Sequence, residues 1–250
     1  PVSGPRAMLS RPLRRLLRWI DPPATIEEQL GTALSSVMPL TSYATVVDVG
    51  ANEGQAARRF LGLMEHANVY SLEPDARPFA VLSQYAASER RLRCFQLAVG
   101  EEPGTLELRA NKESVTNSFL PPVAGAAAGA HVAEMMTQVT SETVRVTTLP
   151  AFCDEQRIES IDLLKLDTQG FEERILRGCR DWLAPGRVRA VLTEALFADL
   201  YVSQARFDHV YAILRDRGYK LHSFHEVEAT SRGGWLWADA LFVSTSEAAA

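Results

Sequence analysis

The sequence predicts an α/β protein built on a mostly parallel, doubly wound β-sheet with helices on both faces. Short apolar runs alternate with helix-length segments between residues 25 and 217, and this alternation is typical of parallel strands joined by crossover helices. The last two apolar runs, 219–224 and 238–244, have no helix-length segment between them. They predict an antiparallel hairpin at the end of the sheet. Ligands of such sheets bind at the carboxyl ends of the strands.

The individual elements follow in order from the local apolar pattern. Strands are expected at residues 45–49, 68–72, 92–99, 143–148, 161–166 and 189–194. Helices are expected at residues 25–37, 53–64, 75–88, 149–157, 170–179 and 204–217. Residues 104–110 alternate like an edge strand or a hairpin arm. Residues 111–142 contain PPVAGAAAGA, lose periodicity and predict a mobile loop or lid.

The N-terminal part is expected to be a helical extension, residues 1–40, ahead of one α/β domain, residues 41–250. In LSRPLRRLLRWI, residues 9–20, Ser10 can cap a helix whose leucines and Ile20 form one apolar stripe beside four arginines. Two interpretations stay open. The helix packs on the domain, or it rests on anionic lipid as a peripheral membrane contact.

Composition excludes several classes of protein. The chain has 250 residues and a net charge of −5, whereas proteins that bind nucleic acid usually carry a basic surplus. Three cysteines without a Cys-x-x-Cys pair indicate neither a disulfide framework nor a zinc site, and they favour a reducing compartment. No apolar run approaches the roughly 20 residues that span a bilayer, and arginines interrupt any signal-peptide pattern. A cytoplasmic protein is expected.

The loop after the first strand, in VVDVGANEGQ, points to a bound ligand. Gly50 allows a close backbone approach, and the following helix N-terminus offers free N–H groups. A dinucleotide fingerprint needs G-x-G-x-x-G here, but the chain has Gly50, Asn52 and Gln55 at those positions. A ligand with a small anionic end, such as an amino-acid carboxylate, fits better than a pyrophosphate.

Glu73 ends the second strand, 23 residues after Gly50, where an acid accepts hydrogen bonds from ribose hydroxyls. A glycine turn and a ribose acid without pyrophosphate-binding residues point to S-adenosylmethionine. Val99 and Gly100, after the third strand, lie where an adenine edge would pack. The alternatives are a helix-capping acid for Glu73 and an ordinary strand end for Val99 and Gly100.

A second informative stretch is IDLLKLDTQGFEERIL, residues 161–176. Lys165 lies in a buried strand, which is costly unless its charge is paired. Asp167 falls at the carboxyl tip of that strand and faces the same crevice as Gly50. Glu172 lies in the first turn of the next helix, where the macrodipole alone explains an acid.

With these motifs in register, the sequence resembles the FkbM family of S-adenosylmethionine-dependent O-methyltransferases. The resemblance covers residues 44–244 and depends most on the K-x-D-x-x-G-x-E pattern. It implies a class I methyltransferase fold, a Rossmann-like sheet of seven strands with the last antiparallel. It also implies that the cofactor is held by the loops after the first two strands, at Asp48, Gly50, Ala51, Asn52, Gly54, Glu73 and Pro74, with Asp167 beside the methyl donor.

The resemblance also implies substrate contacts in TNSFL, where Asn117 and Ser118 would face the crevice. A packing turn is the alternative for this segment.

Transfer to a hydroxyl requires a base within hydrogen-bond reach. Asp167, Glu194, His222 and His225 are candidates at strand ends. Asp167 is the first choice, and His225 is the best-placed histidine, in the loop before the last strand. Lys165 completes the catalytic set, and Glu194 is also assigned to the substrate. An alternative is that Asp167, Glu194 and Asp239 hold a divalent cation such as Mg²⁺.

The expected function is therefore S-adenosylmethionine-dependent O-methylation, with a sugar hydroxyl of a glycan or glycolipid as the acceptor. The resemblance implies sugars, glycolipids or polyketides, and the arginine-rich first helix favours a lipid-linked glycan. The alternatives are a polyketide or other natural-product hydroxyl, a nicotinamide oxidoreductase, and a non-catalytic binding module.

Overall fold

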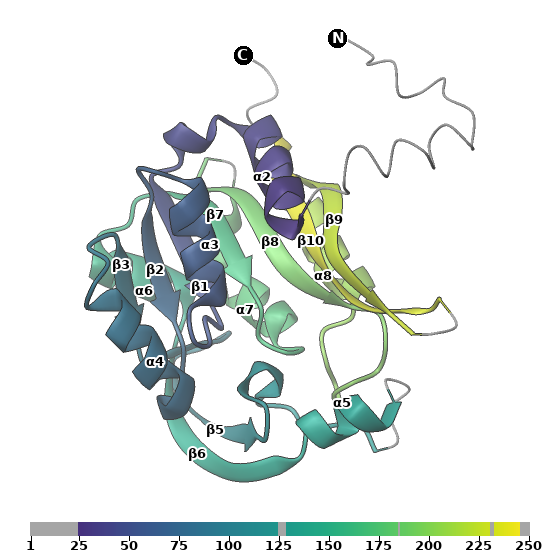
Figure 1. Cartoon of the computed structure of the whole chain (residues 1–250). Coiled ribbons are helices and arrows are strands. Elements are labelled where there is room, and N and C mark those ends of the chain that lie inside the picture. Colours follow the sequence, from purple (N-terminus) through teal and green to yellow (C-terminus); the bar gives the residue numbers. More distant parts are fainter. Residues whose placement is uncertain (1–24, 125–128, 185, 231–232, 246–250) are drawn as a thin grey trace.

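The computed structural model describes residues 25–124, 129–184, 186–230 and 233–245. Its centre is a seven-stranded sheet in the order β3-β2-β1-β7-β8-β10-β9 (Figure 1). The strands are β1 (Thr45–Val49), β2 (Asn68–Leu72), β3 (Leu92–Phe95), β7 (Ile161–Leu166), β8 (Val188–Leu196), β9 (Tyr219–Ala229) and β10 (Trp235–Ser244). β10 pairs antiparallel with β8 and β9, and the other pairs are parallel. The predicted sheet and its terminal hairpin are confirmed.

Helices cover both faces of this sheet. They are α2 (Ile26–Val37), α3 (Gln55–Leu63), α4 (Ala76–Ala86), α6 (Leu149–Gln156), α7 (Glu172–Gly178) and α8 (Phe207–Asp216). Their first turns are fixed by side-chain caps where the sequence supplies them. Thr25 and Glu28 form a capping box on α2, and Asp75 and Thr148 accept the first N–H groups of α4 and α6.

Alternation along the strands divides the core into two layers, because successive side chains point to opposite faces. On β1, Val46 packs into the layer under α2, α3 and α4, whereas Val47 packs into the layer under α6, α7 and α8. Leu163 and Leu164 of the neighbouring β7 divide in the same way. The charged residues at the carboxyl ends of these strands therefore lie between two apolar layers of the core.

A smaller sheet, β4-β6-β5, lies beside the carboxyl edge of the large one. Its strands are β4 (Ala98–Val99), β6 (Gln138–Thr147) and β5 (Gly104–Asn111). The single strand predicted at 92–99 is wrong, because the chain leaves the large sheet after Phe95 and β4 pairs with β6 instead.

The predicted loop at 111–142 also contains regular structure. It holds the 3₁₀ turn η3 (Ser114–Thr116), the helix α5 (Gly129–Met135) and the first half of β6. Residues 138–142 of β6 are mostly exposed, so no apolar alternation revealed this strand.

β9 is longer than expected and continues to Ala229. His225 therefore lies in a strand, opposite Asp239 of β10, rather than in a loop.

The predicted helix at 9–20 lies outside the described residues, so its lipid contact stays a prediction, as does the boundary at residue 40. α2 contributes Leu30, Ala33 and Leu34 to the core layer that also contains Val46. In the part of the chain that the structure describes, no helix is both long and apolar enough to cross a membrane.

Candidate active site

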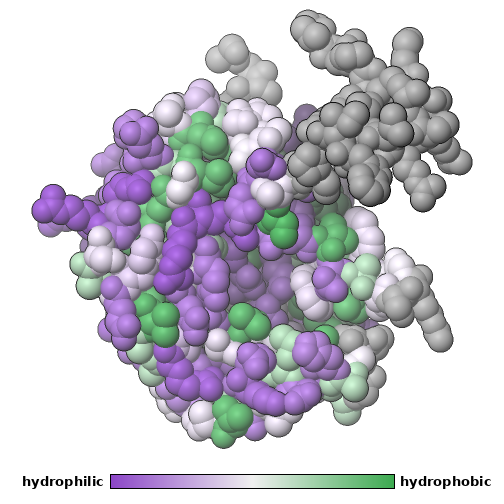
Figure 2. Space-filling view, viewed as in Figure 1, coloured by the Kyte–Doolittle hydropathy of each residue, from purple (hydrophilic) through white to green (hydrophobic). Residues whose placement is uncertain are grey.

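A cavity of about 290 Å³ opens at the carboxyl ends of β1, β2, β7 and β8. Figure 2 shows this face of the molecule hollowed near its centre, with mainly hydrophilic residues around the hollow. The loops after β1, β2 and β7 contribute Gly50, Glu73 and Asp167, as predicted from their positions at strand ends. The predicted residues that line the cavity are Gly50, Ala51, Asn52, Glu73, Pro74, Val99, Asn117, Ser118, Lys165, Asp167 and Glu194.

Gly50 is required by contact between two strand ends. Its φ is +81°, and a Cβ there would lie 1.9 Å from the carbonyl oxygen of Asp167. The Asp167 N–H donates to the Val49 carbonyl at 3.1 Å. Glycine at this position therefore lets the loop after β1 lie directly against the loop after β7.

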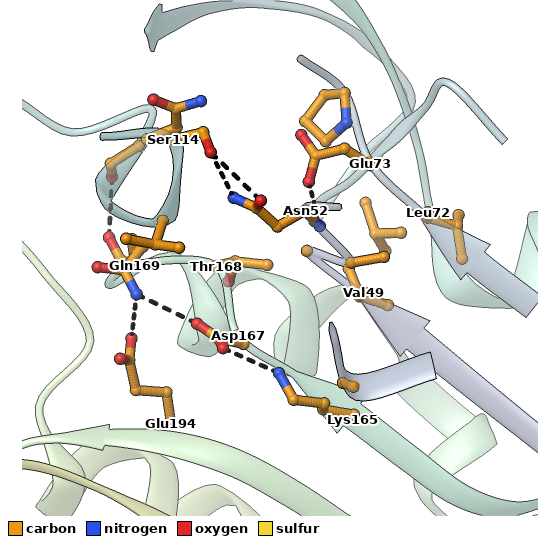
Figure 3. A pocket seen from close by; sticks show the side chains of 18 of the residues that line it. Val49, Asn52, Leu72, Glu73, Ser114, Lys165, Asp167, Thr168, Gln169 and Glu194 are labelled. Carbon is orange, nitrogen blue, oxygen red and sulfur yellow. Dashed lines mark hydrogen bonds and ion pairs between the residues drawn. The ribbon is translucent and has the colours of Figure 1, made fainter. Parts of the chain in front are cut away.

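Glu73 is buried at one end of the cavity (Figure 3). Its Oε2 accepts the Asn52 N–H and its Oε1 accepts the Asp75 N–H, each at 2.8 Å. Burial raises the pKa of Glu73 to about 7, although the two N–H groups oppose the shift by stabilising the charged form. The carboxylate is held rigidly at the point where β2 ends.

Apolar side chains also line the cavity. They include Val49, Leu72, Leu97, Val99, Leu108 and Phe119, together with Pro74. Gly100 is not among the lining residues. Its N–H donates to Thr147, and a Cβ there would lie 2.9 Å from Val146 Cγ1. Gly100 therefore serves the contact between β4 and β6, and its predicted cofactor contact finds no support in this geometry.

The opposite end of the cavity is charged. Lys165 Nζ lies 2.9 Å from Asp167 Oδ2, and both side chains line the cavity. Burial alone would lower the pKa of Lys165, but the carboxylates of Asp167, Asp48 and Asp239 raise it above its ordinary value. The ammonium is therefore the cation that these acids share.

Gln169 was not predicted as a site residue, although it lies inside the KLDTQG motif. Its Nε2 donates to Asp167 Oδ1 at 3.1 Å and to Glu194 Oε2 at 2.9 Å, as Figure 3 shows. The Tyr201 hydroxyl lies 2.8 Å from its Oε1. Sequence patterns did not identify this residue because a polar side chain in a turn has no periodicity. Other lining residues that were not assigned include Gln55, Arg59, Ser114, Thr168, Glu226 and Trp237.

The segment 114–118 forms a roof over the cavity and is tied to three strand-end loops. Asn52 Nδ2 donates to Ser114 Oγ at 3.1 Å, and Asn117 Nδ2 donates to Asp75 Oδ2 at 2.6 Å. Ser118 Oγ donates to the Gln169 carbonyl at 2.8 Å. Asn117 and Ser118 line the cavity, and their hydrogen bonds also hold the segment 114–118 in place. The two interpretations of this segment, side chains that face the crevice and a packing turn, therefore each describe part of the arrangement.

Three predicted residues lie behind the cavity wall. Asp48 is fully buried and accepts the Ser71 hydroxyl at 3.2 Å through Oδ2, and within the described part of the chain its Oδ1 has no hydrogen-bond partner. Gly54 precedes α3 with φ +88°, and His225 Nε2 lies 2.8 Å from Ser223 Oγ. None of the three is among the lining residues, so direct roles for them stay predictions.

The proposed divalent cation has no ligand set in residues 25–124, 129–184, 186–230 and 233–245. No group of three or more His, Cys, Asp or Glu side chains there is arranged to hold a metal ion. Asp167 and Asp239, two of the suggested ligands, act electrostatically on the Lys165 ammonium instead.

Comparison with known families identifies the fold and the chemistry. The model of the methyltransferase FkbM domain matches residues 48–221, which include the carboxyl ends of β1, β2, β7 and β8. The chain belongs to the FkbM methyltransferase family. It is therefore an enzyme whose methyl donor is S-adenosylmethionine, and the resemblance found in the sequence is confirmed.

Two curated relatives agree with this assignment, and one solved structure shares the fold. The 2-O-methyltransferase NoeI of Sinorhizobium fredii (strain NBRC 101917 / NGR234) is 27% identical over 78% of this chain and 80% of its own length. The 31-O-demethyl-FK506 methyltransferase FkbM of Streptomyces tacrolimicus is 31% identical over 70% of this chain and 72% of its own. A crystal structure of methyltransferase FkbM from Methylobacillus flagellatus KT has a TM-score of 0.50 at 16% identity. That match covers 80% of this chain but 43% of the other, so it shows the fold alone.

Proposed function

We propose that this O-methyltransferase transfers a methyl group from S-adenosylmethionine to a hydroxyl of a neutral, hydroxyl-rich acceptor, such as a sugar in a glycan or glycolipid. The printed names of both curated relatives specify an oxygen. The observation that carries the proposal is the charged end of the cavity. It is lined by Asp167, Glu194, Glu226 and Asp239 around the cations Lys165 and Arg59, with Trp237 beside them.

Carboxylates outnumber cations at this end, which favours one kind of acceptor. Carboxylate oxygens accept hydrogen bonds from several sugar hydroxyls at once, and they repel a phosphate or sulfate. Arg59 is already paired with Glu226, which reduces its capacity to bind an anion. An indole such as that of Trp237 offers a flat apolar face to a ring.

The cofactor fits the other end. Glu73 would accept the ribose hydroxyls, and the apolar group around Leu72, Val99 and Phe119 would surround the adenine. When bound, S-adenosylmethionine supplies a methyl group on a positively charged sulfur. In Figure 3, Asp167 lies between Val49 and Glu194, so we assign it to orienting the acceptor hydroxyl toward the donor.

Glu73→Ala is expected to weaken binding of S-adenosylhomocysteine by about 1.5–3 kcal/mol, the contribution of a hydrogen bond to a charged group. Isothermal calorimetry measures this directly. Glu53→Ala is the matched control, because Glu53 is exposed on the same side of the molecule and does not line the cavity. Equal affinities for the two variants would remove the ribose assignment.

A methyl-release assay with labelled S-adenosylmethionine tests the acceptor class. The panel contains a neutral glycolipid, its free oligosaccharide, the same oligosaccharide carrying a sulfate, and a macrolide with a free hydroxyl. We expect label to enter the neutral sugars and not the sulfated one. Label found only in the macrolide would show that the acceptor is a natural-product hydroxyl and not a sugar. Preference for the sulfated sugar would contradict the electrostatic argument.

A further inference from the structure

The side chain of Gln169 joins two carboxylates that stand at the acceptor end of the cavity. Its Nε2 donates one hydrogen bond to Asp167 and one to Glu194. Gln169 adopts φ +54°, a left-handed conformation that is uncommon for a residue with a side chain. Strain of this kind persists where the surrounding structure fixes it, and it is concentrated at functional sites.

Tyr201 contacts the side-chain oxygen of Gln169, on the side of the amide away from the two carboxylates. The Tyr201 hydroxyl is buried and lies 2.8 Å from Gln169 Oε1 and 3.0 Å from the Thr116 carbonyl. When the hydroxyl donates to Oε1, the NH₂ group must point to the two carboxylates. A flipped amide would direct its oxygen at two acids, which is favourable only if they are protonated. The hydroxyl has a single proton, and when it donates to Oε1 rather than to the Thr116 carbonyl, Gln169 is held as a donor to both carboxylates.

The two carboxylates are not equivalent as proton acceptors. Asp167 is bound on both oxygens, by the Lys165 ammonium at 2.9 Å and by Gln169 at 3.1 Å. Each oxygen of Asp167 therefore already has a hydrogen-bond donor within the protein. Glu194 accepts Gln169 through Oε2, and among the described residues no hydrogen bond reaches its Oε1. Glu194 lines the cavity, so this oxygen is the one available to an acceptor.

We propose that Glu194 is the general base of the reaction and that the Tyr201–Gln169 pair positions it, an inference that rests on the proposed transfer to a hydroxyl. In this step the acceptor proton moves to Glu194 Oε1. The acceptor oxygen uses the electron pair of its former O–H bond to bond the methyl carbon. The pair of the broken carbon–sulfur bond stays on sulfur, which becomes a neutral thioether.

The surroundings of Glu194 suit this role. Burial, and then the negative charges of Asp167, Glu172 and Asp239, raise the pKa of Glu194 well above its ordinary value, while Lys165 lowers it. A carboxylate with a raised pKa is a stronger base than an exposed one. The acid limb of the rate profile should therefore lie above the usual carboxyl range.

Substitutions at Glu194 and at Asp239 distinguish the roles of these two carboxylates. Glu194→Gln is expected to lower kcat by about 100- to 10,000-fold, the range for loss of a general base, and to abolish the acid limb. Asp239→Asn removes a carboxylate that faces Glu194 in the strand pairing. The variant should retain the acid limb of the pH–rate profile but shift it to lower pH, because one of the negative charges that raise the pKa of Glu194 is gone. Glu194→Asp should restore part of the turnover that Glu194→Gln loses.

Positioning by the Tyr201–Gln169 pair has a separate readout. Tyr201→Phe keeps the ring and removes the hydroxyl. We expect kcat to fall while KM stays unchanged. Gln169→Met removes the donor that stabilises charged Glu194, so the acid limb should move to higher pH. If the pair had only a structural role, the two substitutions would lower the thermal midpoint of unfolding and leave the acid limb of the pH–rate profile unchanged.

A measurement without substrate completes the test. Infrared difference spectra across a pH titration of the wild type should contain a protonated carboxyl band of Glu194, and this band should be missing from the spectra of Glu194→Gln. Calorimetry should show that Glu194→Gln binds S-adenosylhomocysteine as the wild type does. If Glu194→Gln turns over normally, or keeps the same acid limb, the base assignment is overturned. Failure of the wild type to methylate any hydroxyl would instead overturn the proposed acceptor class.

Discussion

Replacing Lys165 by methionine is expected to destabilise the fold by about 3–5 kcal/mol, because it leaves buried acids without their cation. Lys165 is 6% exposed and lies at 2.9 Å from Asp167, and the negative charges of Asp48 and Asp239 also act on it. Chemical denaturation followed by circular dichroism measures the change. Turnover should also fall, because Asp167 loses its orienting partner.

The matched control is Lys112→Met. Lys112 pairs with Glu134 on the surface, where ion pairs contribute little, so its loss should not change stability measurably. The double variant Lys165→Met/Asp167→Asn should be more stable than Lys165→Met alone, because it removes one of the uncompensated charges. Equal stability of Lys165→Met and the wild type would show that the ammonium is not the shared cation of this site.

Asp167→Asn is expected to lower kcat by about 100-fold, the effect of misplacing a reacting group, while S-adenosylhomocysteine still binds. The asparagine keeps the size of the side chain but loses the charge that holds Lys165 and orients the acceptor. Single-turnover assays per folded molecule measure the effect, and Asp199→Asn is the control because Asp199 pairs with Arg206 at the surface. Normal turnover with a lowered thermal midpoint would reduce Asp167 to a structural residue.

The parts of the fold that sequence reasoning found are those with a strong local pattern. Asp167 directly follows the buried strand β7 and Glu73 directly follows β2, and both acids line the cavity as their positions predicted. Strand ends converge in a parallel sheet regardless of detail, so motif position alone located these residues.

The parts that it missed depend on contacts between distant segments. The first half of β6 is exposed and polar, and only its pairing with β5 makes it a strand. Gln169 became visible as a site residue only when the chain brought Asp167, Glu194 and Tyr201 around it. The roof contact between Ser114 and Asn52 likewise joins loops 62 residues apart, a distance that no local pattern spans.

The central claim is that this cavity transfers a methyl group to oxygen. The most direct measurement uses S-adenosylmethionine labelled with carbon-13 on the methyl group, the wild-type enzyme and the neutral oligosaccharide, followed by NMR of the product. We expect a single new methoxy carbon coupled to a sugar ring proton, formed in equal amount with S-adenosylhomocysteine and formed much more slowly with Glu194→Gln. Label on nitrogen or carbon, or thioether released without a methylated product, would contradict the account.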